Sequence, residues 1–425
     1  MENCADYLPP TRRIVPNSSS EKLVLFGGAP AFTETLHVGR PNIPNRKRFM
    51  QRMEAVLDSY RLTNFGPQVV ELEQQVAEIA GTRHCVATSN ATTGLELAIR
   101  ALGMEGEVIV PSFTFIAGPA ALSWQGIQPV FCDIDPQTHC LDPARVEAAI
   151  TPQTTGILAV HLWGNLCDVE ALQEIADRHA LKLLFDAAHA FGCTVGERSV
   201  GGFGHAEVFS FHATKFINAF EGGAIVTDDD ELAKRLRFMT NFGFSAEDEV
   251  SHLGVNGKMS EASAAMGLTS LEAMSDIIAH NRRIHEAYMR GLEYVPGIRM
   301  MQRNSADQHN YHYIVAELDS ATAGLSRDEL VATLRLENVM ARRYFHPGCH
   351  RMQPYRELYP NAGLFVPETE ALAQKIFILP TGLAVSEADV GLLTNRVAMA
   401  VRQSDQVRVE LARCQDPRLP YFSTA

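Results

Sequence analysis

Residues 181–227 read LKLLFDAAHAFGCTVGERSVGGFGHAEVFSFHATKFINAFEGGAIVT, and this stretch decides the fold. It holds three short apolar runs that end near residues 186, 210 and 227, each bounded by glycine or polar residues typical of turns. Apolar runs of this length predict buried strands. The stretch therefore predicts three strands, with Asp186 at the end of the first and Lys215 in the turn after the second.

Upstream of this stretch, short apolar runs alternate with helix-length segments. Helical patterns occupy residues 95–102, which end at Gly103, and about 168–179. The segments that read as strands are CVATS, EVIVP, PVFCDID and GILAVHLWG. Strands separated by helices are typical of a parallel sheet with crossover helices. In such sheets, ligands bind beyond the carboxyl ends of the strands, so we expect the chemistry there.

The chain divides into four predicted parts. Its first residues are rich in Pro, Ser and Thr without a sustained period, whereas a helical pattern begins behind a capping residue at Asn45. A long helical stretch near residues 260–295 then leads into mixed helix and strand patterns, in which NYHYIVAEL and KIFILP read as strands. We predict an N-terminal extension (1–40), a large domain (41–290), a smaller α+β C-terminal domain (291–405) and a tail (406–425).

Composition excludes several classes of function. A chain of 425 residues is long enough for two domains, and its 37 basic and 50 acidic residues give a net charge of −13 without a basic stripe. We therefore expect no nucleic-acid partner. No run of eighteen apolar residues and no signal-peptide pattern occur, so we expect a cytoplasmic protein with no membrane partner. The eight cysteines lack zinc-ligand spacing, which indicates free thiols and no metal site.

Three polar features could carry chemistry together, although each has an ordinary role alone. Asp186 at a strand end could simply cap a helix, and Lys215 in a polar turn could simply be exposed. The segment SNATTGL at 89–95 is a hydroxyl-rich helix start that favours a phosphate group, and Ser210 ends a neighbouring strand. Combined, they provide a carboxylate, an amine and a phosphate site, which is the set that pyridoxal phosphate requires.

Eight segments of the chain occur in the order found in a known family. They are TNFGP, SNATTGLELAIRAL, EVIVPSFTFIA, PVFCDID, HLWGN, FDAAHAFG, FSFHATK with FEGGAIVT, and GVNGKMSEASAAMGLTSLE. From about Thr63 to Glu272, and more weakly to about residue 400, the chain resembles the DegT-type nucleotide-sugar branch of the fold-type I pyridoxal-phosphate aminotransferases. The resemblance implies an α/β fold: a mostly parallel sheet flanked by helices in a large domain, with a smaller α+β C-terminal domain.

The resemblance also implies roles for individual residues. Lys215 would form the internal aldimine, Asp186 would partner the pyridinium nitrogen, and His189 would lie near the phenolic oxygen of the cofactor; these three are the expected catalytic residues. Phe115 would stack on the ring, and Asn256 would reach the cofactor phosphate of the neighbouring subunit, which implies a homodimer with shared sites. The expected cofactor-binding residues are Ala91, Thr92, Phe115, Asp186, His189, Ser210, Lys215 and Asn256.

Three further residues are candidates for contacting the substrate. Lys258 stands where the family often has Arg, and because Lys is not an equivalent bidentate ligand, its contacts to a sugar diphosphate are open. His161 follows an apolar run, and a hydrogen-bonded core histidine is the interpretation we favour over a substrate contact. His346 lies in RRYFHPGCH, which lacks further ligands at zinc spacing and is interpreted as a substrate-facing loop of the small domain. The segment GGFGH at 201–205 lacks the third glycine of a dinucleotide loop and is interpreted as a turn.

The function implied by the resemblance is transfer of an amino group from glutamate to a nucleoside-diphosphate keto sugar. The segments are most similar to those of TDP-4-keto-6-deoxyhexose aminotransferases, which implies amination at C4 of TDP-4-keto-6-deoxyglucose. Amination at C3, a cyclitol or another ketone as acceptor, and a non-catalytic regulator that binds pyridoxal phosphate are the alternatives. Lys215 argues against the related sugar dehydratases, which have a histidine at that position.

Overall fold

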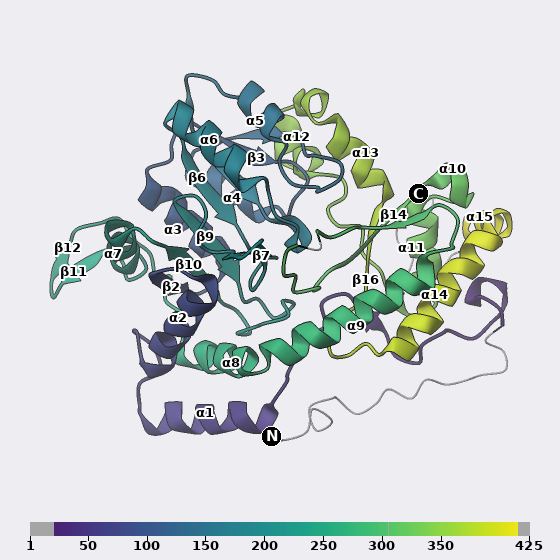
Figure 1. Cartoon of the computed structure of the whole chain (residues 1–425), viewed down its shortest axis with the longest axis horizontal. Coiled ribbons are helices and arrows are strands. Elements are labelled where there is room, and N and C mark those ends of the chain that lie inside the picture. Colours follow the sequence, from purple (N-terminus) through teal and green to yellow (C-terminus); the bar gives the residue numbers. More distant parts are fainter. Residues whose placement is uncertain (1–20, 305, 415–425) are drawn as a thin grey trace.

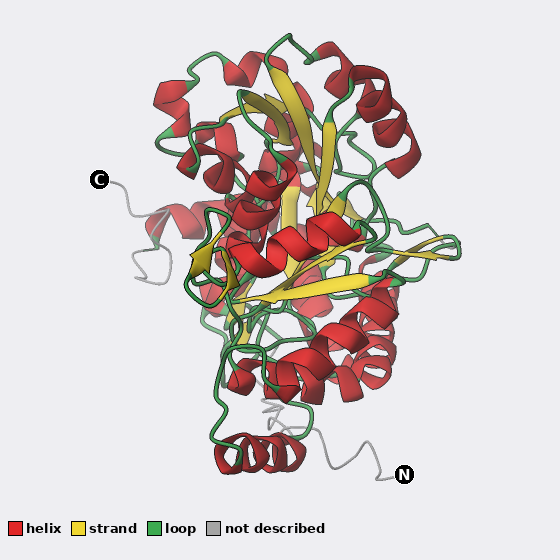
Figure 2. Cartoon of the chain, turned by 90° about the vertical axis from the view of Figure 1, so that its left-hand side faces the viewer, coloured by secondary structure: helices red, strands yellow, loops and turns green. Residues whose placement is uncertain are grey.

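The computed structural model describes residues 21–304 and 306–414. Figure 1 shows a large domain built around a central sheet and a smaller domain reached through a long helix, α9 (Met274–Leu292). Helices surround the strands on both sides in the perpendicular view of Figure 2. Within the described residues, none of the helices is both long and apolar enough to cross a membrane.

Seven strands form the central sheet, in the order β2-β10-β9-β6-β5-β3-β4. They are β2 (His84–Thr88), β3 (Glu107–Pro111), β4 (Gln128–Cys132), β5 (Thr154–Val160), β6 (Lys182–Asp186), β9 (Ala206–Ser210) and β10 (Gly223–Thr227). β10 runs antiparallel to both of its neighbours, and the remaining pairs are parallel. The predicted strands and the mostly parallel sheet are thus confirmed.

Two helical layers cover this sheet because its strands are apolar on both faces. In β6, Leu184 packs in a cluster with residues of α3 and α7, whereas Leu183 and Phe185 pack in a second cluster with residues of α2 and α6. The helices of the large domain are α2 (Pro67–Ala80), α3 (Ala91–Leu102), α4 (Ala117–Trp124), α5 (Pro143–Ala148), α6 (Val169–His179) and α7 (Asp230–Met239). Burial on both faces is typical of parallel strands. The strands, and therefore the residues at their ends, are held in place by the two helical layers.

The long helical stretch predicted near residues 260–295 forms two helices. Ser260 caps α8 (Glu261–Glu272), and its hydroxyl oxygen accepts a hydrogen bond from the Ser263 N–H. Ala273, with φ −103° and ψ 5°, interrupts the helical backbone, and α9 begins at the next residue. The break lets α8 pack on α2 while α9 runs into the small domain.

The small domain contains a three-stranded antiparallel sheet of β13 (Ile298–Met300), β14 (Ile314–Leu318) and β16 (Ile376–Leu379). The segments predicted as strands around residues 310–318 and 375–380 contain β14 and β16. Its helices are α10 (Ser320–Ala323), α11 (Arg327–Leu336), α12 (Tyr355–Leu358), α13 (Pro367–Lys375), α14 (Glu387–Arg402) and α15 (Ser404–Arg413).

The described part of the N-terminal extension belongs to the core of the small domain. Leu23 and Phe32 are buried there, and β1 (Leu36–His37) pairs in parallel with β15 (Val339–Met340). Glu337 accepts hydrogen bonds from backbone N–H groups of this segment at 2.7 and 2.9 Å. The predicted four-part division stays a prediction, but residues 21–37 pack as part of the small domain rather than over its surface. Residues 1–20 and 415–425 of the predicted extension and tail lie outside the described residues.

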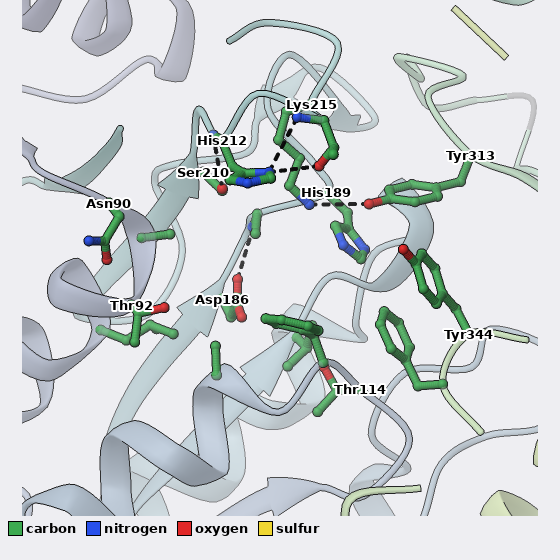
Figure 3. A pocket seen from close by; sticks show the side chains of 18 of the residues that line it. Asn90, Thr92, Thr114, Asp186, His189, Ser210, His212, Lys215, Tyr313 and Tyr344 are labelled. Carbon is green, nitrogen blue, oxygen red and sulfur yellow. Dashed lines mark hydrogen bonds between the residues drawn. The ribbon is translucent and has the colours of Figure 1, made fainter. Parts of the chain in front are cut away.

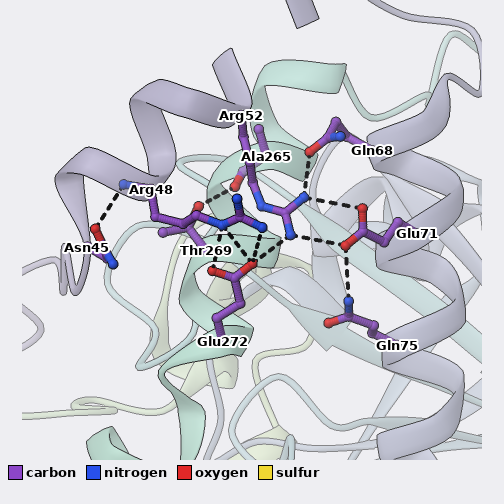
Figure 4. Close-up of polar contacts among 9 residues, drawn as sticks. All are labelled: Asn45, Arg48, Arg52, Gln68, Glu71, Gln75, Ala265, Thr269 and Glu272. Carbon is purple, nitrogen blue, oxygen red and sulfur yellow. Dashed lines mark hydrogen bonds and ion pairs between the residues drawn. The ribbon is translucent and has the colours of Figure 1, made fainter. Parts of the chain in front are cut away.

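Helix α1 (Arg46–Asp58) lies along α8 and is held there by charged side chains (Figure 4). Asn45 caps it as predicted, since its side chain accepts from the Arg48 N–H at 2.8 Å. Arg52, whose side chain is buried, pairs with Glu71 of α2 at 3.0 Å and with Glu272 of α8 at 2.6 Å. These pairs join three helices, and Phe49 of α1 packs edge to face on Phe220 of the loop that follows Lys215, with ring centroids 5.5 Å apart.

Candidate active site

A pocket with a volume of about 280 Å³ lies at the carboxyl ends of β5, β6 and β9 (Figure 3). The last residues of these strands, Val160, Asp186 and Ser210, all line it. This is the edge at which parallel sheets bind ligands. The predicted site residues that line the pocket are Ala91, Thr92, Phe115, Asp186, His189, Ser210 and Lys215.

Lys215 enters the pocket from the loop between β9 and β10, and its Nζ donates a hydrogen bond to the hydroxyl of Tyr313 at 3.1 Å. Burial lowers the pKa of the Lys215 amine to about 8, and the Asp186 carboxylate acts in the opposite direction. A neutral amine is therefore accessible a little above neutral pH. An amine that can lose its proton in this range can act as a nucleophile or a base.

Asp186 is buried at the end of β6, where its carboxylate accepts a hydrogen bond from the Ala188 N–H at 3.0 Å. Burial raises the pKa of the Asp186 carboxyl, while the Ala188 N–H and the charge of Lys215 lower it. A carboxylate whose charge is disfavoured by burial gains stability from a cation placed beside it. The end of β6 therefore suits a ligand that presents a protonated nitrogen.

His189 lines the pocket and packs against the ring of Trp163. Its Nδ1 accepts a hydrogen bond from the backbone N–H of Trp163 at 3.2 Å, and the two rings stack at 5.7 Å with an interplanar angle of 19°. Burial and the nearby charge of Lys215 lower the pKa of His189 well below its usual value. The imidazole is therefore neutral, and because Nδ1 is an acceptor, the proton resides on Nε2.

The far end of the pocket is formed by the N-terminus of α3. Asn90 caps this helix by accepting from the Thr93 N–H at 2.8 Å, and Ala91 and Thr92 form its first turn at the pocket wall. Gly223 of β10 passes so close that a Cβ there would lie 2.7 Å from the nitrogen of Ala91. A helix N-terminus presents unpaired N–H groups and a partial positive charge, so this end suits a phosphate.

Several pocket residues were missed by the sequence analysis. The small domain contributes Tyr313, Tyr344 and Phe345, and the large domain adds His212 and Glu221. Phe345 stacks on Trp163 at 5.0 Å, and Tyr344 stacks on Phe345 at 5.1 Å, so a row of aromatic rings runs from the small domain to His189. The segment RRYFHPGCH was interpreted as a substrate-facing loop. Its aromatic residues Tyr344 and Phe345, rather than its histidines, line the pocket.

Four predicted residues lie outside the pocket lining. Asn256 is exposed, and Lys258 donates to Asn241 Oδ1 at 2.7 Å with its amine over the ring of Phe242. His161 is fully buried, where it stacks on Phe185 at 4.6 Å and lies 3.4 Å from Glu207. This placement agrees with the core histidine favoured above.

His346, the fourth of these residues, is half-buried, and its Nδ1 lies 3.2 Å from the backbone oxygen of Ala373. It therefore packs against α13 rather than facing the pocket. A substrate contact from His346 stays a prediction, as do the roles of Asn256 and Lys258.

Comparison with known families identifies one match over most of the chain. The profile of the DegT/DnrJ/EryC1/StrS aminotransferase family matches residues 44–400. A relative from Shigella dysenteriae, named dTDP-4-amino-4,6-dideoxy-D-glucose transaminase, is 38% identical over 347 residues, which cover 81% of this chain and 93% of the relative.

Solved structures of aminotransferases and related enzymes are also similar to this chain over most of its length. DesI, crystallised in the presence of its TDP-sugar product, is 48% identical with a TM-score of 0.87, and the match covers 91% of this chain and 98% of DesI. The synthase of 3-amino-5-hydroxybenzoic acid is 26% identical with a TM-score of 0.80, and the match covers 87% of this chain and all of that protein.

Proposed function

The chain belongs to the DegT/DnrJ/EryC1/StrS aminotransferase family, and we propose that it moves an amino group from glutamate to C4 of TDP-4-keto-6-deoxyglucose. The protein is a pyridoxal-phosphate-dependent aminotransferase, as its family is. The observation that carries the proposed substrate is the 48% identity to DesI, a protein crystallised in the presence of its TDP-sugar product. The name of the Shigella relative supports the C4 position.

The residues of the pocket fit pyridoxal phosphate at each of its polar groups. Lys215 would hold the aldehyde carbon, Asp186 would pair with the ring nitrogen, and the N-terminus of α3 with Ser210 would hold the phosphate. The Ser210 hydroxyl accepts from the His212 N–H at 3.4 Å, which leaves its own proton free to donate into the pocket. Phe115 lines the pocket with an exposed ring that can cover one face of the cofactor.

When bound, pyridoxal phosphate supplies an electron-withdrawing ring that stabilises negative charge on the α-carbon of the amino donor. Asp186 would keep a proton on the ring nitrogen, because its buried carboxylate is stabilised by an adjacent cation. His189 would donate its Nε2 proton towards the pocket, since its Nδ1 is occupied by the Trp163 N–H. Neither Asp186 nor His189 has to change its protonation state during the reaction.

Lys215 would move the reacting proton. Its amine has a pKa of about 8, so it can both hold and release a proton near neutral pH. General acid–base transfer by a well-placed group contributes about 10²–10⁴-fold to a rate. We therefore assign to Lys215 the removal of the α-proton from glutamate and the return of a proton when the sugar is aminated.

We also propose a homodimer in which Asn256 and Lys258 serve the pocket of the partner. The segment around them exposes large apolar side chains, with Leu253 72% and Val255 46% exposed. Apolar side chains grouped on a surface are typical of an interface. A cytoplasmic location is part of the proposal and is supported by the free cysteines of the described chain, which suit a reducing compartment.

The test is to incubate the enzyme with glutamate and a series of TDP- and UDP-linked keto sugars, and to assign the new amino group by NMR. We expect amination of TDP-4-keto-6-deoxyglucose at C4, with formation of 2-oxoglutarate. Amination at C3 would instead identify the protein as a C3 sugar aminotransferase. Turnover of a cyclitol or another ketone, without competition by a nucleoside diphosphate, would exclude a nucleotide sugar. An absorbance spectrum that glutamate does not change would indicate a non-catalytic regulator.

A further inference from the structure

One contact in the pocket joins the two domains at the reacting group. Tyr313 immediately precedes β14 of the small domain, and its hydroxyl accepts the hydrogen bond from Lys215 Nζ at 3.1 Å (Figure 3). The amine also lies 5.6 Å from the centroid of the Tyr313 ring. The small domain therefore supplies a polar partner for the amine, and the large domain supplies the lysine.

The Tyr313 ring is held in place by its neighbours. Its side chain is 7% exposed, its ring centroid lies 4.4 Å from that of His189, and it meets Trp163 edge to face at 5.3 Å. The His312 ring also contacts it edge to face, with ring centroids 4.5 Å apart. Because three rings pack against it, the position of the Tyr313 side chain is set by packing in addition to its hydrogen bond to Lys215.

The Tyr313 hydroxyl can pair with the amine in either protonation state. Burial raises the pKa of the phenol, with smaller contributions in the same direction from Tyr344 and Asp186, so the hydroxyl keeps its proton. It can accept from an ammonium group or donate to a neutral amine. Burial and the charge of Lys215 lower the pKa of the neighbouring His312 to about 3, so that imidazole is neutral. A neutral partner of this kind leaves the amine free to gain and lose a proton.

We propose that Tyr313 is a further catalytic residue, whose hydroxyl holds the amine of Lys215 whenever that amine is not joined to the cofactor. This inference rests on the proposed role of Lys215. A lysine on a flexible stem must return to the same place in each half-reaction, and a fixed hydrogen-bond partner reduces the orientations that it has to search. Tyr313 thereby keeps the amine pointed at the reacting carbon.

The first test compares Tyr313→Phe with wild type, because this change removes the hydroxyl and keeps the ring. In the apoenzyme, Lys215 is acylated with limiting acetic anhydride over a range of pH, and the labelled peptide is quantified by mass spectrometry. Loss of an acceptor for the ammonium form should lower the pKa of Lys215 by about one unit. In the holoenzyme, kcat should fall about 10–100-fold, with KM for the sugar changed less than threefold.

Tyr311→Phe is the matched control. Tyr311 lies two residues away in the same segment, its ring packs on His285 and His309, and it does not line the pocket. This variant should leave the acid dissociation constant of Lys215 and kcat within about twofold of wild type. If Tyr313→Phe also stays within twofold on both readouts, the inference is wrong.

A second test uses the wild-type protein and does not depend on a variant that folds. The enzyme is crystallised after conversion to its pyridoxamine phosphate form by glutamate, in which Lys215 is free. The inference predicts Nζ of Lys215 within hydrogen-bonding distance of the Tyr313 hydroxyl. An amine directed to another partner would overturn it. If borohydride instead fails to fix the cofactor to Lys215 in the wild-type holoenzyme, the proposed role of Lys215 itself fails.

Discussion

The backbone N–H of Trp163 donates a hydrogen bond to Nδ1 of His189 at 3.2 Å, while the indole ring of the same residue stacks on the imidazole. The loop after β5 therefore fixes both the tautomer and the ring plane of a residue that follows β6. Trp163 itself has a positive φ of 65°, a conformation that few non-glycine residues adopt. The fold thus holds this loop in an unusual conformation beside the proposed cofactor site.

His189 should not titrate in the working range. Burial and the charge of Lys215 lower its pKa well below the usual value, so it stays neutral at neutral pH and above. Replacing it in His189→Asn should lower kcat about 10–100-fold without changing the shape of the pH profile, because a hydrogen bond near the reacting groups is lost. The measurement is kcat against pH for both proteins. A wild-type inflection near pH 6.5 that disappears in the variant would contradict a neutral His189.

Asp186→Asn should separate cofactor attachment from turnover. The neutral amide cannot pair with a protonated ring nitrogen, so kcat should fall about 10²–10³-fold, as for loss of a preorganised electrostatic partner. Borohydride should still fix pyridoxal phosphate to the variant, because attachment depends on Lys215. Asp186→Glu is the control that keeps the charge and should retain more activity than Asp186→Asn. Equal activity of Asp186→Asn and wild type would remove Asp186 from the catalytic set.

Lys215→Met should stabilise the apoprotein at neutral pH. Burial lowers the pKa of Lys215 from 10.5 to about 8, so between these values the unfolded chain binds more protons than the folded chain. The destabilisation by Lys215 is therefore complete below pH 8 and is lost as the pH rises towards 10.5. We expect a gain on the order of 1–3 kcal/mol in the free energy of unfolding at pH 7, which shrinks over that interval.

Urea unfolding of the apoprotein at pH 7 and pH 10 measures this effect. The exposed Lys234→Met is the control and should change stability by less than about 0.5 kcal/mol at both pH values. A stabilisation by Lys215→Met that is equal at the two pH values would show that the gain comes from packing rather than from charge.

Asn42→Ala should weaken both stability and turnover. The Asn42 side chain donates to the Phe216 backbone oxygen at 3.1 Å and accepts from the Leu383 N–H at 3.1 Å, so it links the loop next to Lys215 to the small domain. Loss of buried partners costs about 1–3 kcal/mol, and a shift of the loop should lower kcat about tenfold.

Asn45→Ala is the control for Asn42→Ala, because it removes the cap of the neighbouring helix α1 at a cost of about 1 kcal/mol but keeps the hydrogen bonds of Asn42 to Phe216 and Leu383. Thermal unfolding and kcat are measured for both variants. If the two variants lose stability but neither loses activity, Asn42 has no role in positioning the loop.

Local sequence patterns predicted the strands and the helix start that depend on residues close together in the sequence. The apolar runs located β6, β9 and β10, and the predicted cap at Asn45 is where helix α1 begins. The site residues that follow strand ends were predictable for the same reason. Asp186 and Ser210 end strands of one sheet, and the carboxyl ends of parallel strands meet at one edge.

The residues contributed by the small domain were not predictable in this way. The alternation in NYHYIVAEL predicts a strand but does not say whether Tyr311 or Tyr313 faces the lysine, because that depends on how the two domains pack. The role of Asn42 had no local signal, since the segment before α1 is held by side-chain hydrogen bonds rather than by a periodic apolar face. The break at Ala273 was also hidden in a continuous helical pattern.

The central claim is that Lys215 carries the cofactor, and reduction of the wild-type holoenzyme with borohydride tests it most directly. Peptide mapping by mass spectrometry after reduction should find the pyridoxyl group on Lys215, and prior treatment with glutamate should prevent its formation. A pyridoxyl group on another lysine, or a reduced holoenzyme without any covalent adduct, would contradict the account.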